Sequence, residues 1–190
     1  MTATHSHMVI IGGTGMLAAV SRALADRCKV LTSVARTEES LRKLDKAIAN
    51  ANCEHCLLAL DWSDPDGFVD ALAEHVHRIG PPALVLAWLH DDELGPGLAK
   101  SLAPTDIPCD FFQVRGSASA NPAQRAASFL LDRDIPGTIN YHQIILGFHL
   151  CGDGSRWLHD SEISAGVLRA IDNPRSVTIV GSVAPWSSRP

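Results

Sequence analysis

Residues 8–18 read MVIIGGTGMLA, an apolar run that passes directly into a glycine-rich turn. The run from Met8 to Ile11 is typical of a buried strand, and the residues after Gly15 have the pattern of a helix. Glycines let the backbone take a positive φ and approach a pyrophosphate closely, while the N-terminus of the next helix attracts negative charge. The spacing G-x-x-G-x-x-A at this position therefore indicates a dinucleotide site. A tight strand-to-helix turn without a ligand is the alternative.

Apolar, β-branched runs alternate with helical patterns along the rest of the chain, which is typical of a parallel sheet with helices on both faces. We expect strands near residues 8–12, 29–35, 55–60, 83–89, 109–115, 138–148 and 177–181. We expect helices near residues 15–27, 37–50, 65–79, 121–133 and 160–172, with a short one around 94–102. The predicted fold class is α/β: a Rossmann-like, doubly wound parallel sheet of about seven strands in one domain, residues 1–190.

Composition limits the function classes. The chain has 190 residues and a formal net charge of −5, so it has no basic field for a nucleic acid. It contains no apolar stretch of the roughly 18 residues that a membrane helix needs, and no signal-like start, so we expect a cytoplasmic protein without a membrane partner.

The five cysteines are scattered, which favours a reducing compartment over a disulfide framework: Cys28, Cys53, Cys56, Cys109 and Cys151. Two of them form a C-x-x-C beside His55, so metal or redox chemistry stays open as an alternative to two small residues that enter a strand.

With these motifs the chain resembles the short-chain dehydrogenase/reductase family over nearly its whole length. GGTGMLA is similar to the glycine-rich turn of the epimerase-like and NmrA-like branches. Residues 155–171, SRWLHDSEISAGVLRAI, resemble the family's helix near the C-terminus. The resemblance implies that the turn residues bind the cofactor: Gly12, Gly13, Thr14, Gly15, Met16 and Leu17.

The resemblance also points to the cofactor's identity. Arg36 and Thr37 follow the second predicted strand, where the family separates NADP users from NAD users. An acid there would accept the ribose 2′-hydroxyl, whereas an arginine meets a 2′-phosphate with a charge-assisted contact. We therefore expect NADP. The alternative for Arg36 is a solvated charge that opens a surface helix.

Further cofactor contacts are implied by position in the family pattern. Asp61-Trp62 corresponds to the acidic residue near the adenine ring, with a turn-capping acid as the alternative. Ala87-Trp88 lies at the end of the fourth strand, where the family usually has Asn-Asn-Ala-Gly. The Trp88 indole either covers the cofactor ribose or the substrate space, or packs against other side chains. Gly147 stands where a Pro-Gly borders the nicotinamide.

The family's catalytic pair is missing. Residues 121–127, NPAQRAA, stand where Tyr-x-x-x-Lys-Ala-Ala is expected, so Arg125 keeps a cation for the ribose but no tyrosine acid precedes it. The remaining catalytic candidates are Ser117 (with Ser119 as its rival for the family's serine), Tyr141 and His142; His90 is a further donor. Tyr141 and His142 are neighbours in a predicted strand, so at most one faces a given pocket.

Two functions follow. The first is an NADP-dependent oxidoreductase that reduces a small carbonyl or imine compound. An imine is suggested because its iminium form already carries a proton and needs little help from the missing tyrosine acid. The second is a non-catalytic, NmrA-like sensor of NADP(H). Only about twenty residues separate the fourth and fifth strands, too few for the long helix that usually builds the family's dimer interface. A homodimer therefore replaces the usual tetramer as the oligomer to test.

Overall fold

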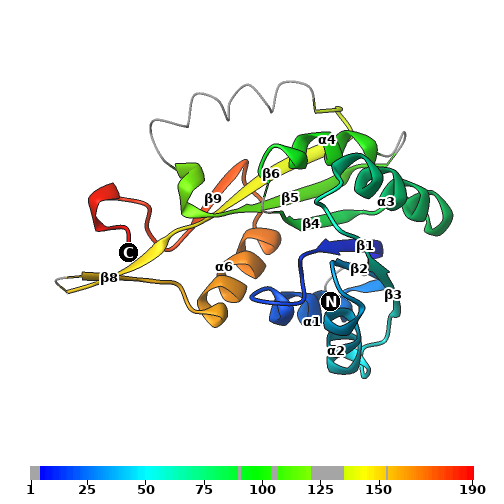
Figure 1. Cartoon of the computed structure of the whole chain (residues 1–190), viewed down its shortest axis with the longest axis horizontal. Helices are drawn as coiled ribbons and strands as arrows, with labels where there is room; N and C mark the ends of the chain where they lie inside the picture. The colour runs from blue at the N-terminus through cyan, green and yellow to red at the C-terminus, as the bar shows by residue number, and fades with distance from the viewer. Residues whose placement is uncertain (1–4, 90, 104–106, 121–134, 153) are drawn as a thin grey trace.

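The computed structural model describes residues 5–89, 91–103, 107–120, 135–152 and 154–190. Within them, seven strands form one sheet in the order β3-β2-β1-β4-β5-β6-β9, and every neighbouring pair is parallel (Figure 1). The strands in chain order are β1 (His5–Ile11), β2 (Cys28–Ala35), β3 (Glu54–Ala59), β4 (Leu84–Trp88), β5 (Cys109–Arg115), β6 (Ile139–Leu146) and β9 (Val177–Val180). Each of the seven predicted strands is confirmed.

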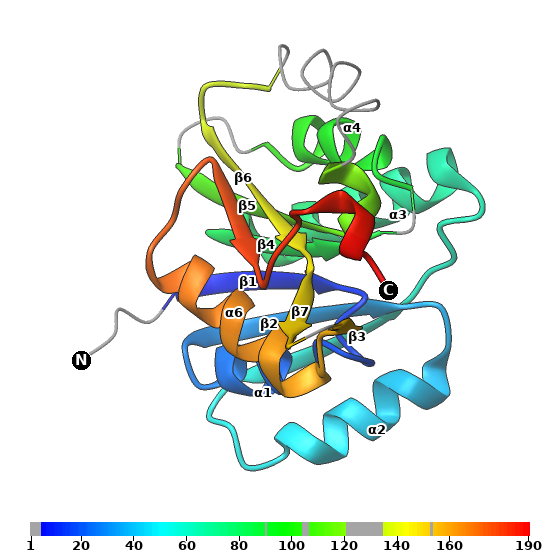
Figure 2. The ribbon, with the colours of Figure 1, turned by 90° about the vertical axis from the view of Figure 1, so that its left-hand side faces the viewer.

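Helices cover both faces of the sheet. One face carries α1 (Ala18–Ala25), α2 (Glu38–Ile48) and α6 (Asp160–Asp172), and the other carries α3 (Pro65–Ile79) and α4 (Leu94–Ser101) (Figures 1 and 2). This arrangement confirms the doubly wound α/β prediction. The expected helix at 121–133 lies outside the described residues. No helix of the described part is long and apolar enough to cross a membrane.

The sheet separates two hydrophobic clusters. Met8 and Ile10 of β1 belong to the cluster under α1 and α6, whereas Val9 and Ile11 belong to the cluster under α3 and α4. Alternate side chains of a strand point to opposite faces, so an unbroken apolar run is what a central parallel strand requires. Burying each such side chain contributes about 1.5–3 kcal/mol. The N-terminal run therefore sits at the centre of the core.

Helix starts follow the sequence signals. The Asp64 carboxylate accepts a hydrogen bond from the Gly67 N–H at 3.3 Å, and Pro65 takes the first helical position of α3. The Thr37 hydroxyl accepts one from the Ser40 N–H at 3.3 Å and caps α2. These caps fix the points where the chain leaves the carboxyl edge of the sheet.

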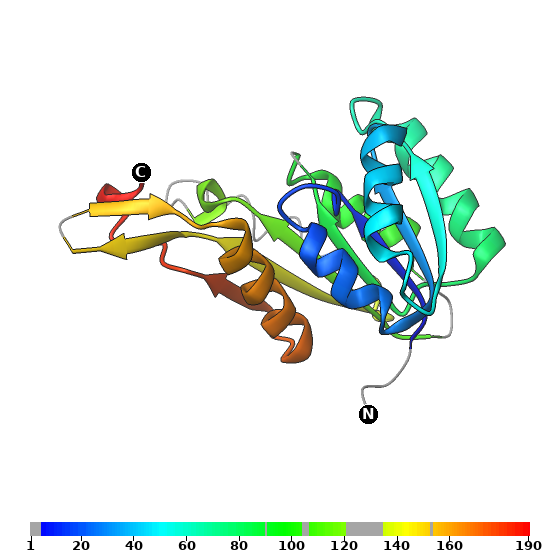
Figure 3. The same cartoon turned by 90° about the horizontal axis from the view of Figure 1, so that it is seen from below.

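An antiparallel hairpin interrupts the path from β6 to α6. It consists of β7 (Phe148–Cys151) and β8 (Gly154–Trp157), and it extends beyond the sheet (Figure 3). The sequence pattern did not predict it, because strands of four residues are too short to show an alternation. The predicted strand 138–148 ends earlier, at Leu146, since the backbone turns there into the hairpin. Two short 3₁₀ helices, η1 (Ser117–Ala120) and η3 (Trp186–Ser188), lie at the same end.

Candidate functional site

The strand order places a crevice between β1 and β4. The chain leaves β1 towards β2 on one side and β4 towards β5 on the other, and ligands of open α/β sheets bind where the order reverses in this way. The glycine turn follows β1 at this point, and Trp88 ends β4. A cavity of about 320 Å³ lies there, lined by Gly12, Thr14, Gly15, Met16, Ala35, Arg36, Thr37, Ser40, Trp62 and Trp88.

The three glycines of the turn have different surroundings. Gly12 has φ +72°, and a Cβ there would lie 2.6 Å from the Trp88 carbonyl oxygen. A Cβ on Gly13 would lie 2.4 Å from the Ser21 Oγ, whereas one on Gly15 would meet no atom within 4 Å. Gly12 and Gly13 are therefore required by backbone conformation and packing, while Gly15 leaves open space beside the cavity.

The turn before α1 has backbone N–H groups that could bind an anion. Its first turn has no capping side chain and no acidic residue. Among the described residues, the backbone N–H groups of Thr14, Gly15 and Met16 have no hydrogen-bond acceptor. Unsatisfied N–H groups and the positive end of a helix dipole attract phosphate. The turn thus fits a pyrophosphate.

The opposite wall of the cavity carries the positive charge. The Arg36 guanidinium lies 5.1 Å from the centre of the Trp62 ring, a cation–π geometry. Within the described part of the chain, no Asp or Glu lines the cavity and no carboxylate lies within 4 Å of Arg36. Ser40, which sequence reasoning missed, faces the same space from the first turn of α2. Its place in the first helical turn after Arg36 and Thr37 could have predicted this position.

Five residues expected at the cofactor do not line the cavity. Leu17 and Ala87 are fully buried in the two core clusters, and Gly13 packs on α1 and β1. The Asp61 carboxylate accepts a hydrogen bond from the Ser63 N–H at 3.0 Å, which is the turn-capping alternative. Gly147 packs against the Ser182 backbone.

Trp88 links the cavity to the end of β5. Its ring lies within 3.3 Å of the Cβ position of Gly12 and 4.0 Å of that of Gly116. The next residue, Ser117, is buried, and its Oγ accepts a hydrogen bond of 2.8 Å from the Nε of Arg189. Sequence reasoning missed Arg189, since nothing in its local pattern marks it. The indole therefore lies between the glycine turn and Gly116, the residue before the serine.

Tyr141 and His142 lie away from the cavity and face opposite sides of the sheet. The Tyr141 hydroxyl donates to the Gln113 Oε1 at 2.5 Å, and its ring stacks on Phe111. The His142 ring stacks on Phe112. Tyr141 and His142 lie about 16 and about 13 Å, respectively, along β6 from its carboxyl end at Leu146. The structure therefore does not bring either of them to Ser117.

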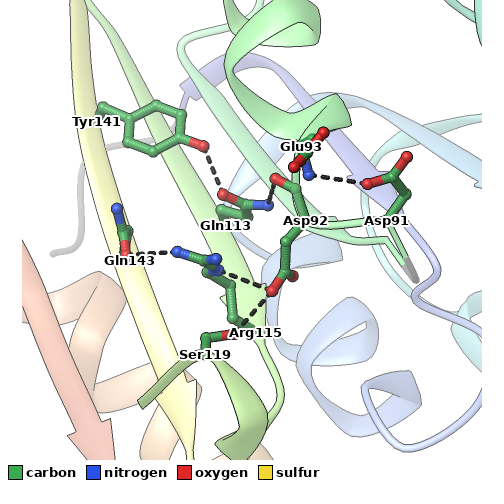
Figure 4. Close-up of polar contacts among 8 residues, drawn as sticks. All are labelled: Asp91, Asp92, Glu93, Gln113, Arg115, Ser119, Tyr141 and Gln143. Atoms are coloured by element: carbon green, nitrogen blue, oxygen red, sulfur yellow. Dashed lines mark hydrogen bonds and ion pairs between the residues drawn. The ribbon is translucent and has the colours of Figure 1, made fainter. Parts of the chain in front are cut away.

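A polar network ties the loop after β4 to β5 and β6 (Figure 4). The Asp92 carboxylate lies 3.1 Å from the Nε of Arg115 and accepts a hydrogen bond of 2.7 Å from Ser119. Arg115 also donates to the Gln143 Oε1 at 3.1 Å, and Gln113 donates to the Asp92 carbonyl oxygen at 2.8 Å. Ser119 is thus a structural hydroxyl, which favours Ser117 over it. His90 and Arg125 lie outside the described residues.

The C-x-x-C has no metal partner in the described part of the chain, where no group of three His, Cys, Asp or Glu residues could hold an ion. Burial raises the pKa of the Cys53 and Cys56 thiols, so the reactive thiolate is disfavoured at both positions. The structure thus favours the packing interpretation of these residues.

Comparison with known proteins gives a likeness in structure alone. No family model matches the chain, and no curated protein matches its sequence. A bulky-bulky ketone specific alcohol dehydrogenase from Comamonas testosteroni superposes with a TM-score of 0.72 at 13% identity, over 96% of this chain and 88% of that one.

A short-chain dehydrogenase from Sphingobium yanoikuyae in complex with NADPH gives a TM-score of 0.72 at 14% identity, over 96% and 91%. A putative D-mannonate oxidoreductase from Haemophilus influenza with bound NAD gives a TM-score of 0.68 at 11% identity, over 93% of both chains. The chain has the Rossmann-like fold of the short-chain dehydrogenases/reductases.

Proposed function

We propose that the protein is an NADP-dependent oxidoreductase of the short-chain dehydrogenase/reductase type that acts on a small carbonyl or imine compound. The observation that carries the proposal is the cavity at the β1–β4 switch point. It combines a glycine turn with free N–H groups and Arg36 beside an indole, and none of the described residues that line it is acidic. The similarity of the chain's fold to that of proteins solved with bound NADPH and NAD supports the same function.

Each wall of the cavity has a role in this proposal. The N–H groups of Thr14, Gly15 and Met16 bind the pyrophosphate, and Trp62 packs against the adenine. Arg36 pairs with the 2′-phosphate, because its guanidinium matches three acceptor oxygens that NAD lacks. Without an acid at this position the ribose 2′-hydroxyl of NAD gains no comparable contact. NADP is thus favoured over NAD.

The chemistry requires the site to extend past Trp88 to the end of β5. When bound, a reduced nicotinamide supplies a hydride, which a carbonyl or iminium carbon accepts. With a carbonyl substrate, the Ser117 hydroxyl donates a hydrogen bond to the carbonyl oxygen, since its own oxygen already accepts from Arg189 and no described residue accepts from it. An iminium substrate needs no such donor, because its nitrogen already carries a proton. A carbonyl oxygen then takes its proton from water. Tyr141 and His142 have no part in this scheme.

Titration with NADPH, NADP, NADH and NAD tests the cofactor assignment. The phosphorylated pair should bind more tightly, and Arg36→Ala should weaken it about tenfold or more while leaving NADH unchanged. Arg42→Ala is the control, because Arg42 is an exposed cation of α2 outside the cavity. Equal affinity for NADPH and NADH would reject the NADP assignment, and binding of none of the four would reject the function.

The alternative is a non-catalytic NADP(H) sensor, favoured by the placement of the chain's single tyrosine away from the cavity. A reductase consumes NADPH when a panel of ketones, 2-oxo acids and cyclic imines is added. A sensor binds NADPH and NADP with clearly different affinities and consumes neither. Following NADPH absorbance with this panel, beside the titration, separates the two.

A further inference from the structure

The C-terminal segment carries an arginine into the neighbourhood of Ser117. After β9, the Phe148 and Ser182 backbones exchange two hydrogen bonds of 2.8 Å, which fix the segment to β7. Ser155 lies on β8, the other strand of the hairpin, and its hydroxyl donates to the Ser188 carbonyl oxygen of the terminal segment. The segment therefore lies along the hairpin (Figures 1 and 3) and ends at the carboxyl end of β5.

The guanidinium of Arg189 is held by three groups. Its carbon lies 5.0 Å from the centre of the Trp157 ring and 5.5 Å from that of Trp186. Its Nε donates to the Ser117 Oγ at 2.8 Å. Two indoles and one hydroxyl thus fix the side chain, which lowers the entropy that it loses when a ligand binds.

The terminal edge of this guanidinium is available for a ligand. With Nε engaged by Ser117, the two Nη groups remain as a planar pair of donors. No carboxylate of the described residues lies within 4 Å of Arg189. The neighbouring cation, Arg115, is already paired with Asp92. Among the residues that the structure describes, the site therefore offers one unpaired positive charge and a bidentate fork.

We propose that Arg189, oriented by Ser117, Trp157 and Trp186, binds the carboxylate of an organic acid, so that the substrate of this enzyme carries its reducible carbonyl or imine beside a carboxylate. A carboxylate matches both the single charge and the planar fork, whereas a phosphate dianion calls for more than one cation. This substrate class rests on the proposed function. The anion site itself does not, because its residues lie outside the cofactor cavity.

The test is a titration of the full chain, with and without NADP, using benzoate and oxamate as carboxylate probes, benzamide as the neutral isostere and inorganic phosphate as the competing anion. Heat of binding and tryptophan fluorescence are the readouts. Benzoate or oxamate should bind, and benzamide should not. Arg189→Gln should lower the carboxylate affinity about tenfold or more, and Arg189→Lys should retain part of it.

Arg175→Gln is the matched control, because Arg175 is an exposed cation before β9, remote from Ser117. The proposal is overturned if neither carboxylate binds, if benzamide binds equally, if phosphate binds more tightly, or if Arg175→Gln loses as much affinity as Arg189→Gln. Unchanged NADPH affinity in Arg189→Gln shows that the variant is folded. Carboxylate binding without cofactor binding would instead reject the proposed function and keep the anion site.

Discussion

Residues 5–88 and residues 109–190 supply strands to the same parallel sheet, yet they build their functional surfaces differently. All ten residues that line the cavity fall within Gly12 to Trp88, at the ends of strands, in the turns that follow them or, for Ser40, in the first turn of α2. In the second part, Arg189 reaches Ser117 across 72 positions of the chain, through a hairpin and a terminal segment. Repeated β–α units thus place residues by local rules, whereas the second surface depends on contacts between distant segments.

The largest effect is expected where the terminal segment meets the hairpin. A Cβ on Gly147 would lie 2.1 Å from the Ser182 carbonyl oxygen, and a backbone atom cannot move aside as a side chain can. Gly147→Ala should therefore lower the free energy of unfolding by about 3 kcal/mol. Denaturant unfolding measures it. Gly154→Ala, in β8 with no atom within 4 Å, is the control and should change little.

The cofactor cavity is lined by residues of the first region alone. Gly147→Ala, in the second region, should therefore keep its NADPH affinity under conditions where the variant is folded. A loss of NADPH affinity as large as the loss of stability would show that the two regions are coupled.

A glycine pair tests the first region. Gly13→Ala places a methyl group 2.4 Å from the Ser21 Oγ and 2.5 Å from the Ile10 Cγ2, so unfolding free energy should fall by about 2 kcal/mol. Gly15→Ala meets open space and should leave stability unchanged, but its methyl group should hinder the pyrophosphate and weaken NADPH binding. Stability and affinity are measured for both variants. A Gly15→Ala protein with full affinity would contradict the proposed turn.

A buried histidine network gives the first region its own pH dependence. The Thr32 hydroxyl lies 2.9 Å from the Nε2 of His7 and 3.0 Å from that of His75, and the Nδ1 of His7 donates to the Gly80 carbonyl oxygen. Burial lowers the pKa of both histidines below 6.5, and their mutual repulsion lowers that of His7 further. The folded state thus binds fewer protons than the unfolded state below this pH.

Stability should accordingly be flat above pH 6.5 and fall as the pH drops from 6.5 through the lowered folded-state pKa values. Thr32→Val leaves two ring nitrogens without their partner and should cost about 1 kcal/mol. Unfolding curves on either side of pH 6.5 measure both effects. A histidine NMR titration that found ordinary pKa values for His7 and His75 would contradict the assignment.

The smallest effect is expected in the second region at more acid pH. Glu162 accepts from Arg156 at 2.7 and 2.9 Å and from the His159 N–H at 2.8 Å. The Arg156 guanidinium, followed by the His159 N–H, lowers the pKa of this carboxyl from 4.5 to about 2. Its stabilisation is present above pH 4.5 and is lost as the pH falls towards 2.

Glu162→Gln should remove this acid dependence and leave the loss below pH 6.5 intact. Acid unfolding of the variant beside the unchanged protein checks it. The effect stays small because the pair is partly exposed and screened by solvent. If Glu162→Gln lost stability below pH 4.5 as the unchanged protein does, another group would be responsible for the titration.

Eight of the predicted cofactor residues line the cavity because their positions follow from strand ends and helix starts. Trp62 and Trp88 were expected on position alone, and both indoles line it. Ala87 was expected there too, but it points into the core, because adjacent strand residues face opposite sides. Neither Tyr141 nor His142 lines the cavity, because both lie several residues before the carboxyl end of β6, whereas the cavity lies at the carboxyl ends of other strands.

The parallel sheet, its seven strands, the glycine turn and the placement of Arg36 just before the second helix follow from the sequence alone. These features depend on hydrophobic periodicity, glycine conformation and capping, all of which act over a few residues. Only the tertiary structure decided the hairpin, the course of the terminal segment and the meeting of Arg189 with Ser117 and two indoles. Such contacts join residues far apart in the chain, so their partners are selected by packing and leave no local pattern to read.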